Sequence, residues 1–331
     1  MPACQNVGGE DGGPDLSTAS GLTEDSGSTD PTGTAQTSGP TNGTGADGTG
    51  ADGTGADADS SGSGEGGSES STSGDPPPPA EPCTAVDMIF VVDNSDPMLE
   101  EQLRLLGSTF AFVQQVQQTI PTLVDDIHIG VITTDDELFV QPGESGVPGC
   151  ELPYEGGNPW MISSSVALQA ELECALMVGA EGSPNERPMD MLTGALSDEN
   201  LAPGGLHNGF LRDEALLVVV LVTNEDDEIE DDTAWGSMGE PADWVATVAG
   251  RKGGWVNDVV VLSLLGTPKP NACPKFQWDG TEGAQVAPRL IEYTESFPQG
   301  AVGDICLPEY ATFMLGVVPG VTAACAAYTP I

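Results

Sequence analysis

The chain has 331 residues and a net charge of −44 at pH 7, from 52 Asp and Glu side chains against 8 Lys and Arg. A negative charge of this size repels nucleic-acid phosphates and anionic lipid head groups, which excludes nucleic acid binding and polybasic membrane contacts. It favours divalent cations and basic partners.

Residues 1–82 are predicted to form an unfolded tether. They consist almost wholly of Gly, Ser, Thr, Asp, Glu, Ala and Pro, repeat Gly-Thr-Gly-Ala-Asp three times at 43–57, and contain 14 acids and no base. With so few apolar side chains, nothing offsets a backbone ordering cost of about 1 kcal/mol per residue. Residues 83–331 are therefore expected to form the one folded domain.

Cys4 is a candidate lipidation site. It follows Met1-Pro2-Ala3 and precedes the tether, which resembles the mature start of a bacterial lipoprotein. The apolar stretch of a lipoprotein signal is absent, so two alternatives stay open: a start codon assigned too late, or an unmodified Cys in the tail. No run approaches the roughly 20 apolar residues of a membrane-spanning helix. We therefore expect membrane contact only through such a lipid anchor.

After Cys83, predicted strands and helices alternate. Short apolar runs predict buried strands, and apolar residues at helical spacing predict helices. The strands are expected at 86–93, 127–134, 215–223 and 257–265, and the helices at 98–120, 165–178, 187–196 and 243–250, with weaker helical signals at 289–297 and 308–317. The apolar stripe of the first helix is expected at Leu99, Leu103, Leu106, Phe110, Val113, Val116 and Ile120, with Gln102 off the stripe. This order predicts an α/β fold, a doubly wound and mostly parallel sheet with helices on both faces.

Six cysteines in the predicted domain suggest three disulfides. They include no CxxC pair and have no nearby His that would indicate zinc. Six cysteines allow 15 pairings; we expect Cys83–Cys325 to join the domain ends, and Cys150–Cys174 and Cys273–Cys306 to close local loops. Such bonds persist in an oxidising compartment, which favours an exported protein over the alternative of six reduced thiols in the cytosol.

Three stretches together resemble a von Willebrand factor type A domain. Residues 87–98 (Asp-Met-Ile-Phe-Val-Val-Asp-Asn-Ser-Asp-Pro-Met) are similar to that family's first strand and Asp-x-Ser-x-Ser motif. Residues 127–135 resemble its second strand, and 217–227 its fourth strand with the acidic loop that follows. The closest resemblance is to exported bacterial examples with a low-complexity tail and disulfides. In this chain the predicted domain, residues 83–331, includes a disulfide-containing C-terminal extension.

The resemblance implies a divalent cation, most often Mg²⁺, whose open coordination position takes an acidic side chain of a partner protein. Asp93 and Ser95 match the ligand motif, whereas Pro97 replaces its second Ser and Asn224 replaces a later Asp. The family's Thr ligand lies before a helix; the corresponding loop here, 182–186, offers Ser183, Asn185 or Glu186. Asp96, Glu225 or Asp226 are candidates to compensate. The expected metal ligands are Asp93, Ser95, Asn224, Asp226 and Glu186.

The sequence favours an exported protein of the cell envelope or a secreted one, which binds another protein and serves adhesion. Two alternatives stay open: a hydrolase whose cluster of Asp93, Asp96 and Asp226 binds a metal that activates water, or a structural envelope protein without metal. No GxSxG, HExxH, P-loop or dinucleotide-binding motif occurs, so no catalytic residue is predicted.

Overall fold

The structure is a computed structural model that describes residues 79–96, 98–144, 149–228, 235–276, 283–329 and 331. Cys4 and positions 1–78 of the predicted tether lie outside these residues. Residues 79–82 have no helical or strand structure, and the backbone N–H of Glu81 donates to the carbonyl of Tyr328 at 2.8 Å. The segment before β1 therefore contacts the folded domain at Glu81, two residues before the predicted start of the domain.

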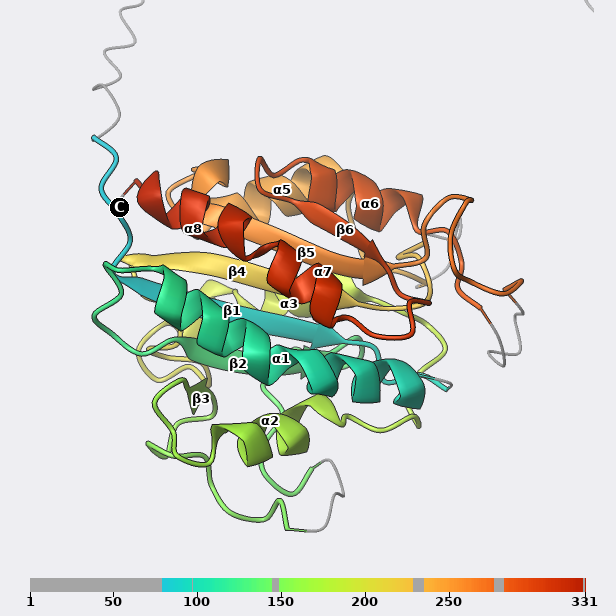
Figure 1. The fold of residues 1–331 in the computed structure, drawn as a ribbon, viewed down its shortest axis with the longest axis horizontal. Helices are drawn as coiled ribbons and strands as arrows, with labels where there is room; N and C mark the ends of the chain where they lie inside the picture. Colours follow the sequence, from blue (N-terminus) through green and yellow to red (C-terminus); the bar gives the residue numbers. More distant parts are fainter. Residues whose placement is uncertain (1–78, 97, 145–148, 229–234, 277–282, 330) are drawn as a thin grey trace, which may run out of the picture. The chain divides into compact units, whose positions relative to one another are not determined.

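A six-stranded sheet forms the centre of the domain, with strand order β3-β2-β1-β4-β5-β6 (Figure 1). Neighbouring strands are parallel except β3, which is antiparallel to β2. The strands are β1 Ala85–Val92, β2 His128–Thr133, β3 Met161–Ile162, β4 Ala215–Val222, β5 Val259–Leu265 and β6 Ala301–Asp304. This is the mostly parallel α/β sheet that the sequence predicts.

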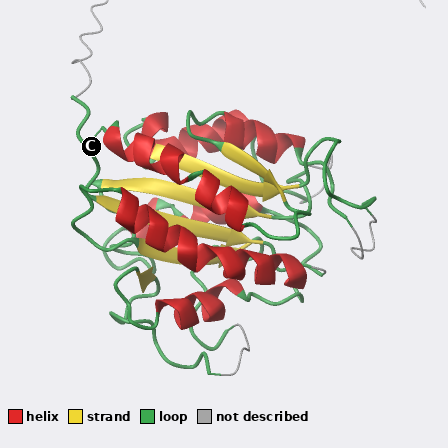
Figure 2. Ribbon diagram, viewed as in Figure 1, coloured by secondary structure: helices red, strands yellow, loops and turns green. Residues whose placement is uncertain are grey.

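Helices cover both faces of the sheet (Figure 2). Alternate residues of a strand point to opposite faces: Phe90 of β1 packs on one side and Val91 on the other. On the first side lie α1 Leu99–Thr119, α2 Leu168–Leu176, α7 Ala311–Gly316 and α8 Val318–Ala326, and on the second α3 Pro188–Ala195, α5 Pro241–Gly250 and α6 Pro288–Glu295. All of β1 and β4 is buried, which explains their continuous apolar sequences.

Several short elements were not predicted. They are the strands β3 and β6, the helices α4 Asp198–Leu201 and α8, and the 3-10 turn η1 Val256–Asp258. Strands of two and four residues are too short to show a periodic pattern. The predicted helical segment 308–317 is shorter in the structure, where α7 ends at Gly316 and α8 follows after one residue.

The predicted buried stripe of α1 is wrong at its first turns. Leu99 and Leu103 are 46% and 57% exposed, whereas Gln102 is fully buried together with Leu105. The Gln102 side-chain amide donates to the backbone oxygens of Asp93 and Gly179, at 3.1 and 2.6 Å. Two carbonyls that no strand or helix satisfies thus recruit a polar side chain into the core. This turns the helix relative to the stripe that apolar periodicity predicts.

Three disulfides join Cys83 to Cys325, Cys150 to Cys174 and Cys273 to Cys306, which are the expected pairs. The first links the residues before β1 to the end of α8, so the two ends of the folded domain lie side by side (Figure 1). The N–H of Cys83 also donates to the carbonyl of Cys325 at 2.8 Å. Among the described residues, no helix combines the length and the apolar character needed to cross a membrane.

The disulfide between the domain ends is expected to contribute most to stability. A cross-link over 242 residues removes more entropy from the unfolded chain than one over 24 residues; the two effects are about 5.5 and about 3.5 kcal/mol. Urea unfolding of a C83A/C325A variant should therefore show a larger loss of free energy of unfolding than that of a C150A/C174A variant. An equal or smaller loss would contradict this order.

Candidate metal centre

The candidate centre lies at the point between β1 and β4 where the strand order of the sheet reverses. Strands β1 and β4 are neighbours in the sheet, but the chain moves outward from them to opposite edges, and ligands of doubly wound sheets bind at the carboxyl ends of such strands. The pairing places Val92 opposite Val222, and the N–H of Asp93 donates to the carbonyl of Val222 at 3.0 Å. The loops that follow β1 and β4 therefore begin side by side.

Asp93 is the first residue after β1 and is completely buried. Its Oδ1 accepts the N–H of Ser95, and its Oδ2 accepts the hydroxyl of Thr223, both at 2.8 Å. Burial raises the pKa of Asp93, while the donors of Ser95, Thr223 and Asn224 oppose that rise. The carboxylate is thus fixed in orientation by both loops.

Glu186 reaches the same place from the loop before α3. The loop approaches the end of β1 closely: the N–H of Gly182 donates to the carbonyl of Asn94 at 2.8 Å, and a Cβ at Gly182 would lie 2.7 Å from that oxygen. The N–H of Ser183 donates to Asp135 Oδ2 at 2.7 Å. Only a glycine allows this approach, which leaves Glu186 3% exposed.

The charge of Asp93 raises the pKa of two neighbouring acids, Glu186 and Glu225. Burial first, and then the charge of Asp93, raises the pKa of Glu186 to about 10, and the charges of Glu225 and Asp135 add to the rise. The same two causes, burial and the charge of Asp93, raise the pKa of Glu225 to about 7. Of the ion pairs in the described part of the chain, none includes Asp93 or Glu186.

Buried oxygen atoms without a hydrogen-bond partner surround these acids. Nine buried side-chain atoms of the described residues lack a hydrogen-bond partner, and four of them belong to predicted metal ligands: Ser95 Oγ, Asn224 Oδ1 and both carboxylate oxygens of Glu186. Buried polar atoms are almost always paired, because an unpaired one costs about 1–3 kcal/mol. A cation or a hydrogen-bond donor at this centre would satisfy these four oxygens.

A second buried acid shows how the fold otherwise treats such a group. Asp87, in the middle of β1, is also completely buried. The guanidinium of Arg212 donates to its Oδ1 at 2.6 and 2.8 Å, and the N–H of Arg212 donates to its Oδ2 at 2.7 Å. The centre at Asp93 and Glu186 holds two acids without such a partner.

The structure brings four of the five predicted ligands together. Asp93, Ser95, Asn224 and Glu186 supply carboxylate, hydroxyl and amide oxygens, which are the ligands that hard cations such as Mg²⁺ prefer. This donor set therefore fits a divalent cation. Pro97, at the position of the missing second Ser, lies outside the described residues.

Asp226, the fifth predicted ligand, is bound elsewhere. Its Oδ2 and Oδ1 accept the N–H groups of Arg289 and Leu290, at 3.3 and 3.2 Å, at the start of α6. An acid at this position stabilises a helix through its free N–H groups and its dipole. We therefore assign Asp226 to the attachment of α6 rather than to the cluster around Asp93.

The acids of the hydrolase hypothesis have separate surroundings. Asp93 is buried in the centre, Asp96 is exposed, and Asp226 binds α6. The next acid along the chain, Asp227, also stabilises the fold. It accepts the N–H groups of Ser237 and Met189 at 2.5 and 3.1 Å. The rest of the acidic run, residues 229–232, lies outside the described residues.

The sequence analysis gave no role to Thr134 or Asn94, and both belong to the centre. Thr134 Oγ1 donates to Asn94 Oδ1 at 3.2 Å, and Thr134 lies close to Glu186. Their positions in the sequence could have identified them: Thr134 directly follows β2, and the carboxyl ends of parallel strands lie at one edge of the sheet. Glu225, named above only as a substitute ligand, lies near enough for Asp93 to raise its pKa.

One other group of possible ligands occurs in the described part of the chain. Cys273, Asp304 and Cys306 place a ligand atom each within 4.8 Å of one another. The two sulfur atoms are joined in a disulfide and carry no thiolate. This group therefore does not compete with the centre at Asp93.

No protein-family model and no curated protein matches this chain. Similar solved structures include two of proximal thread matrix protein 1 from the mussel byssus, at 11% and 13% sequence identity and TM-scores of 0.38 and 0.35. A third is the pilus adhesin SpaC from Lactobacillus rhamnosus GG, at 11% identity and a TM-score of 0.36. They cover 73%, 74% and 75% of this chain, which spans 49%, 47% and 31% of theirs, less than half in each case. The function proposed for this chain rests on the geometry of its own residues.

Proposed function

We propose that the domain is an exported protein-binding module that uses a divalent cation, Mg²⁺ in the first place, to hold a carboxylate of its partner. Asp93, Ser95, Asn224 and Glu186 are the proposed ligands. The observation that supports this most directly is the set of four buried, unpartnered oxygens around two buried acids without an ion-pair partner.

Desolvation explains why such a centre favours a cation. A buried carboxylate without a counter-charge is so costly that it takes up a proton or binds a cation. Asp93 accepts two hydrogen bonds, which fix the orientation of its carboxylate, and burial and the charge of Asp93 raise the pKa of Glu186 to about 10. A divalent cation would supply the missing charge to both acids and a partner to the oxygens of Ser95 and Asn224.

The ligand set also favours an open coordination position. Asn224 provides a neutral amide where the family pattern has an Asp, so protein charge comes from Asp93 and Glu186, with Glu225 half-buried nearby. Mg²⁺ keeps several of its water molecules in protein sites of this kind. One of these positions would take a carboxylate of a protein partner, which is the basis of the proposed adhesion.

The proposed location is outside the cytosol, in the cell envelope or secreted. Three disulfides support it, because such bonds persist in oxidising compartments. The acidic sequence of residues 1–82 would then hold the domain away from its anchor, which we propose to be a lipid on Cys4.

A metal-free structural protein is the second candidate. The raised pKa of Glu186, about 10, gives the centre another way to remove a charge, because a protonated Glu186 carries none. In this case the fold would keep the strand-end loops but bind no cation.

Thermal unfolding with added cation separates the two candidates. After chelator treatment, Mg²⁺, Mn²⁺ or Ca²⁺ should raise the Tm in proportion to the logarithm of its concentration, with about 2.7 kcal/mol of stabilisation at a hundred times Kd. A Ser95→Ala variant should lose most of this shift. Because Ser95 Oγ has no hydrogen-bond partner in the described structure, the same variant should unfold at nearly the wild-type Tm without cation.

Ser296→Ala is the matched control, since this Ser lies at the end of α6 and its exposed hydroxyl donates to the carbonyl of Glu292. It should keep the full cation shift. If none of the three cations moves the wild-type Tm, the metal-dependent function is wrong and the metal-free candidate stands.

The pKa of Glu186 predicts how pH affects the chelated protein. Its pKa is raised from 4.5 to about 10 in the folded state, so the folded protein binds this proton more tightly than the unfolded one. The stability that this gives is complete below about pH 4.5 and is lost as the pH rises toward 10, by at most about 1.4 kcal/mol per unit. In chelator, Glu186→Gln should lose less stability than wild type between pH 6 and pH 9.

Urea unfolding at several pH values measures this difference. The exposed Glu292, on α6, gives the control variant Glu292→Gln, which should follow wild type. Parallel pH curves for wild type and Glu186→Gln would mean that Glu186 is ionised in the folded protein across this range.

A further inference from the structure

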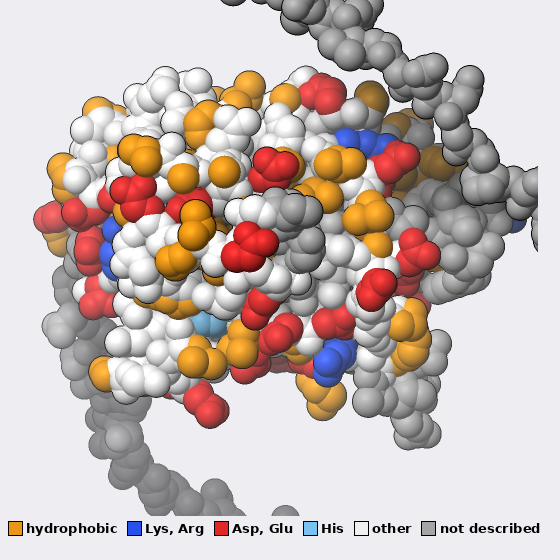
Figure 3. All heavy atoms as spheres, turned by 90° about the horizontal axis from the view of Figure 1, so that it is seen from below, with side chains coloured by type: hydrophobic (Ala, Val, Ile, Leu, Met, Phe, Trp, Pro, Cys, Tyr) orange, Lys and Arg blue, Asp and Glu red, His pale blue; other side chains and the backbone are white. Residues whose placement is uncertain are grey.

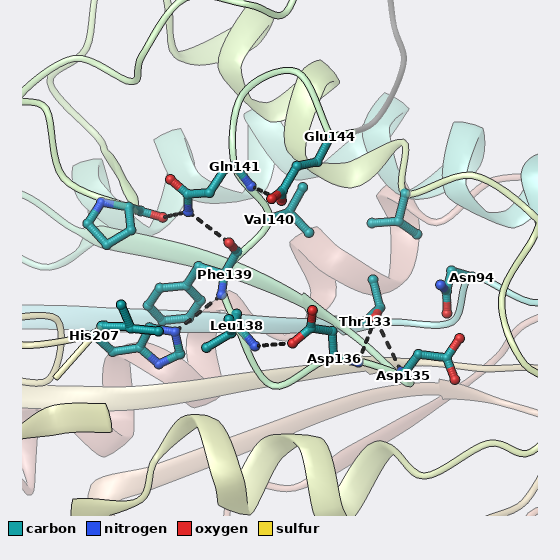
Figure 4. Close-up of a pocket in the computed structure, with 13 residues that line it drawn as sticks. Asn94, Thr133, Asp135, Asp136, Leu138, Phe139, Val140, Gln141, Glu144 and His207 are labelled. Atoms are coloured by element: carbon teal, nitrogen blue, oxygen red, sulfur yellow. Dashed lines mark hydrogen bonds between the residues drawn. The ribbon is translucent and has the colours of Figure 1, made fainter. Parts of the chain in front are cut away.

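A pocket of about 620 Å³ lies beside the metal centre, under the loop that follows β2. Asn94 and Asp135, which hold the loop of Glu186 in place, also line this pocket (Figure 4). Its volume falls within the range of about 300–1,000 Å³ that is usual for ligand sites. None of the preceding assignments uses it.

One wall of the pocket is apolar and rigid. The ring of Phe139 stacks on His207 at a centroid distance of 3.8 Å, and Leu138 and Leu206 extend the wall toward solvent. A Cβ at Gly130 of β2 would lie 2.3 Å from the Phe139 ring, so this glycine makes the space in which the ring lies. The wall is thus built into the sheet.

His207 contributes no positive charge to the pocket. Its Nε2 accepts the N–H of Phe139 at 3.2 Å, so its Nδ1 carries the proton and donates to the carbonyl of Ala195 at 2.9 Å. The ring is 1% exposed, and burial lowers its pKa. Both nitrogens are therefore used within the protein, and the imidazole is neutral.

Three carboxylates also line the pocket. One oxygen of each accepts a backbone N–H: Asp135 from Ser183 at 2.7 Å, and, as Figure 4 shows, Asp136 from Leu138 at 2.9 Å and Glu144 from Gln141 at 2.5 Å. Within the described residues, the second oxygen of each has no hydrogen-bond partner. No Lys or Arg lines the pocket. On one face of the molecule, acidic side chains likewise spread widely while Lys and Arg form small separate groups (Figure 3).

We propose that this pocket binds a Lys or Arg side chain of the protein partner. The aliphatic stem would lie on Phe139, Leu138 and Leu206, and the cationic head would meet the free carboxylate oxygens, since such side chains place methylene groups on apolar surface and keep their charge among polar groups. This deepens the proposed function, on which it rests: the partner would present an acid to the metal centre and a base to this pocket.

Calorimetric titration of the full chain tests the pocket with single residues. The probes are Nα-acetyl-lysine amide and Nα-acetyl-arginine amide, with Nα-acetyl-norleucine amide as the uncharged control of similar shape. We expect at least one cationic amide to bind with a Kd of about 1 mM and the norleucine amide to bind roughly tenfold more weakly. Binding should weaken with added salt.

The charge assignment is tested by the D136N/E144Q variant, in which both positions are exposed. It should bind the cationic amide about five- to tenfold more weakly than wild type, and Glu292→Gln should bind it equally well. Equal binding of the norleucine amide would overturn the proposal in favour of a purely apolar pocket. A Kd above about 10 mM for both cationic amides would also overturn it.

These outcomes are independent of the metal centre. The probes carry no carboxylate, so they should bind equally with Mg²⁺ and with chelator present. A cation-dependent Tm together with no probe binding would reject the pocket and keep the metal centre. Probe binding without any cation effect on the Tm would reject the metal centre and keep a basic partner for the pocket.

Discussion

The pairing of β1 with β4 is the constraint on which the rest of this domain depends. Their register, Val92 opposite Val222, brings the two strand-end loops together at the point where the strand order reverses. Asp93 then bonds to both loops through Ser95 and Thr223. Both strands are buried on both faces, so a shift of register would mispack their apolar side chains against the two layers of helices. The strong apolar drive for this one alignment is what holds polar, partly unsatisfied loops in a fixed place.

The buried acids of this fold differ in their hydrogen-bond and ion-pair partners, and this difference supports the proposed function. Asp87 is neutralised by Arg212, Asp226 holds the start of α6, and Asp227 ties together the segments of Met189 and Ser237. Each of these acids has a complete set of partners and a structural role. Asp93 and Glu186 share a buried place with four unpartnered oxygens and no ion pair among the described residues. That difference favours a cation at this centre over a purely structural role.

The neighbouring pocket also offers carboxylate oxygens without a partner among the described residues, and we propose that they bind a basic side chain of the protein partner. Its carboxylates are each oriented by one backbone N–H and keep a second oxygen free, while Phe139 and His207 form a rigid neutral wall. Because the loop of Glu186 is held by Asn94 and Asp135, which also line the pocket, the two sites have a fixed spacing. A partner that fits both would need an acidic and a basic side chain at a matching distance. Such a double requirement gives selectivity that a single coordination position does not provide.

The sequence by itself determined the α/β class, the four long strands and the main helices, because continuous apolar runs and helical periodicity report burial directly. Its resemblance to von Willebrand factor type A domains also pointed to Asp93, Ser95, Asn224 and Glu186 as candidate ligands. Only the tertiary structure decided what periodicity does not encode. Gln102 is buried because two carbonyls need donors, Asp226 turns to α6 because that helix start needs an acceptor, and Thr134 and Asn94 join the centre. These are long-range hydrogen bonds, and their partners are set by which loops the sheet brings together rather than by the residues beside them in the chain.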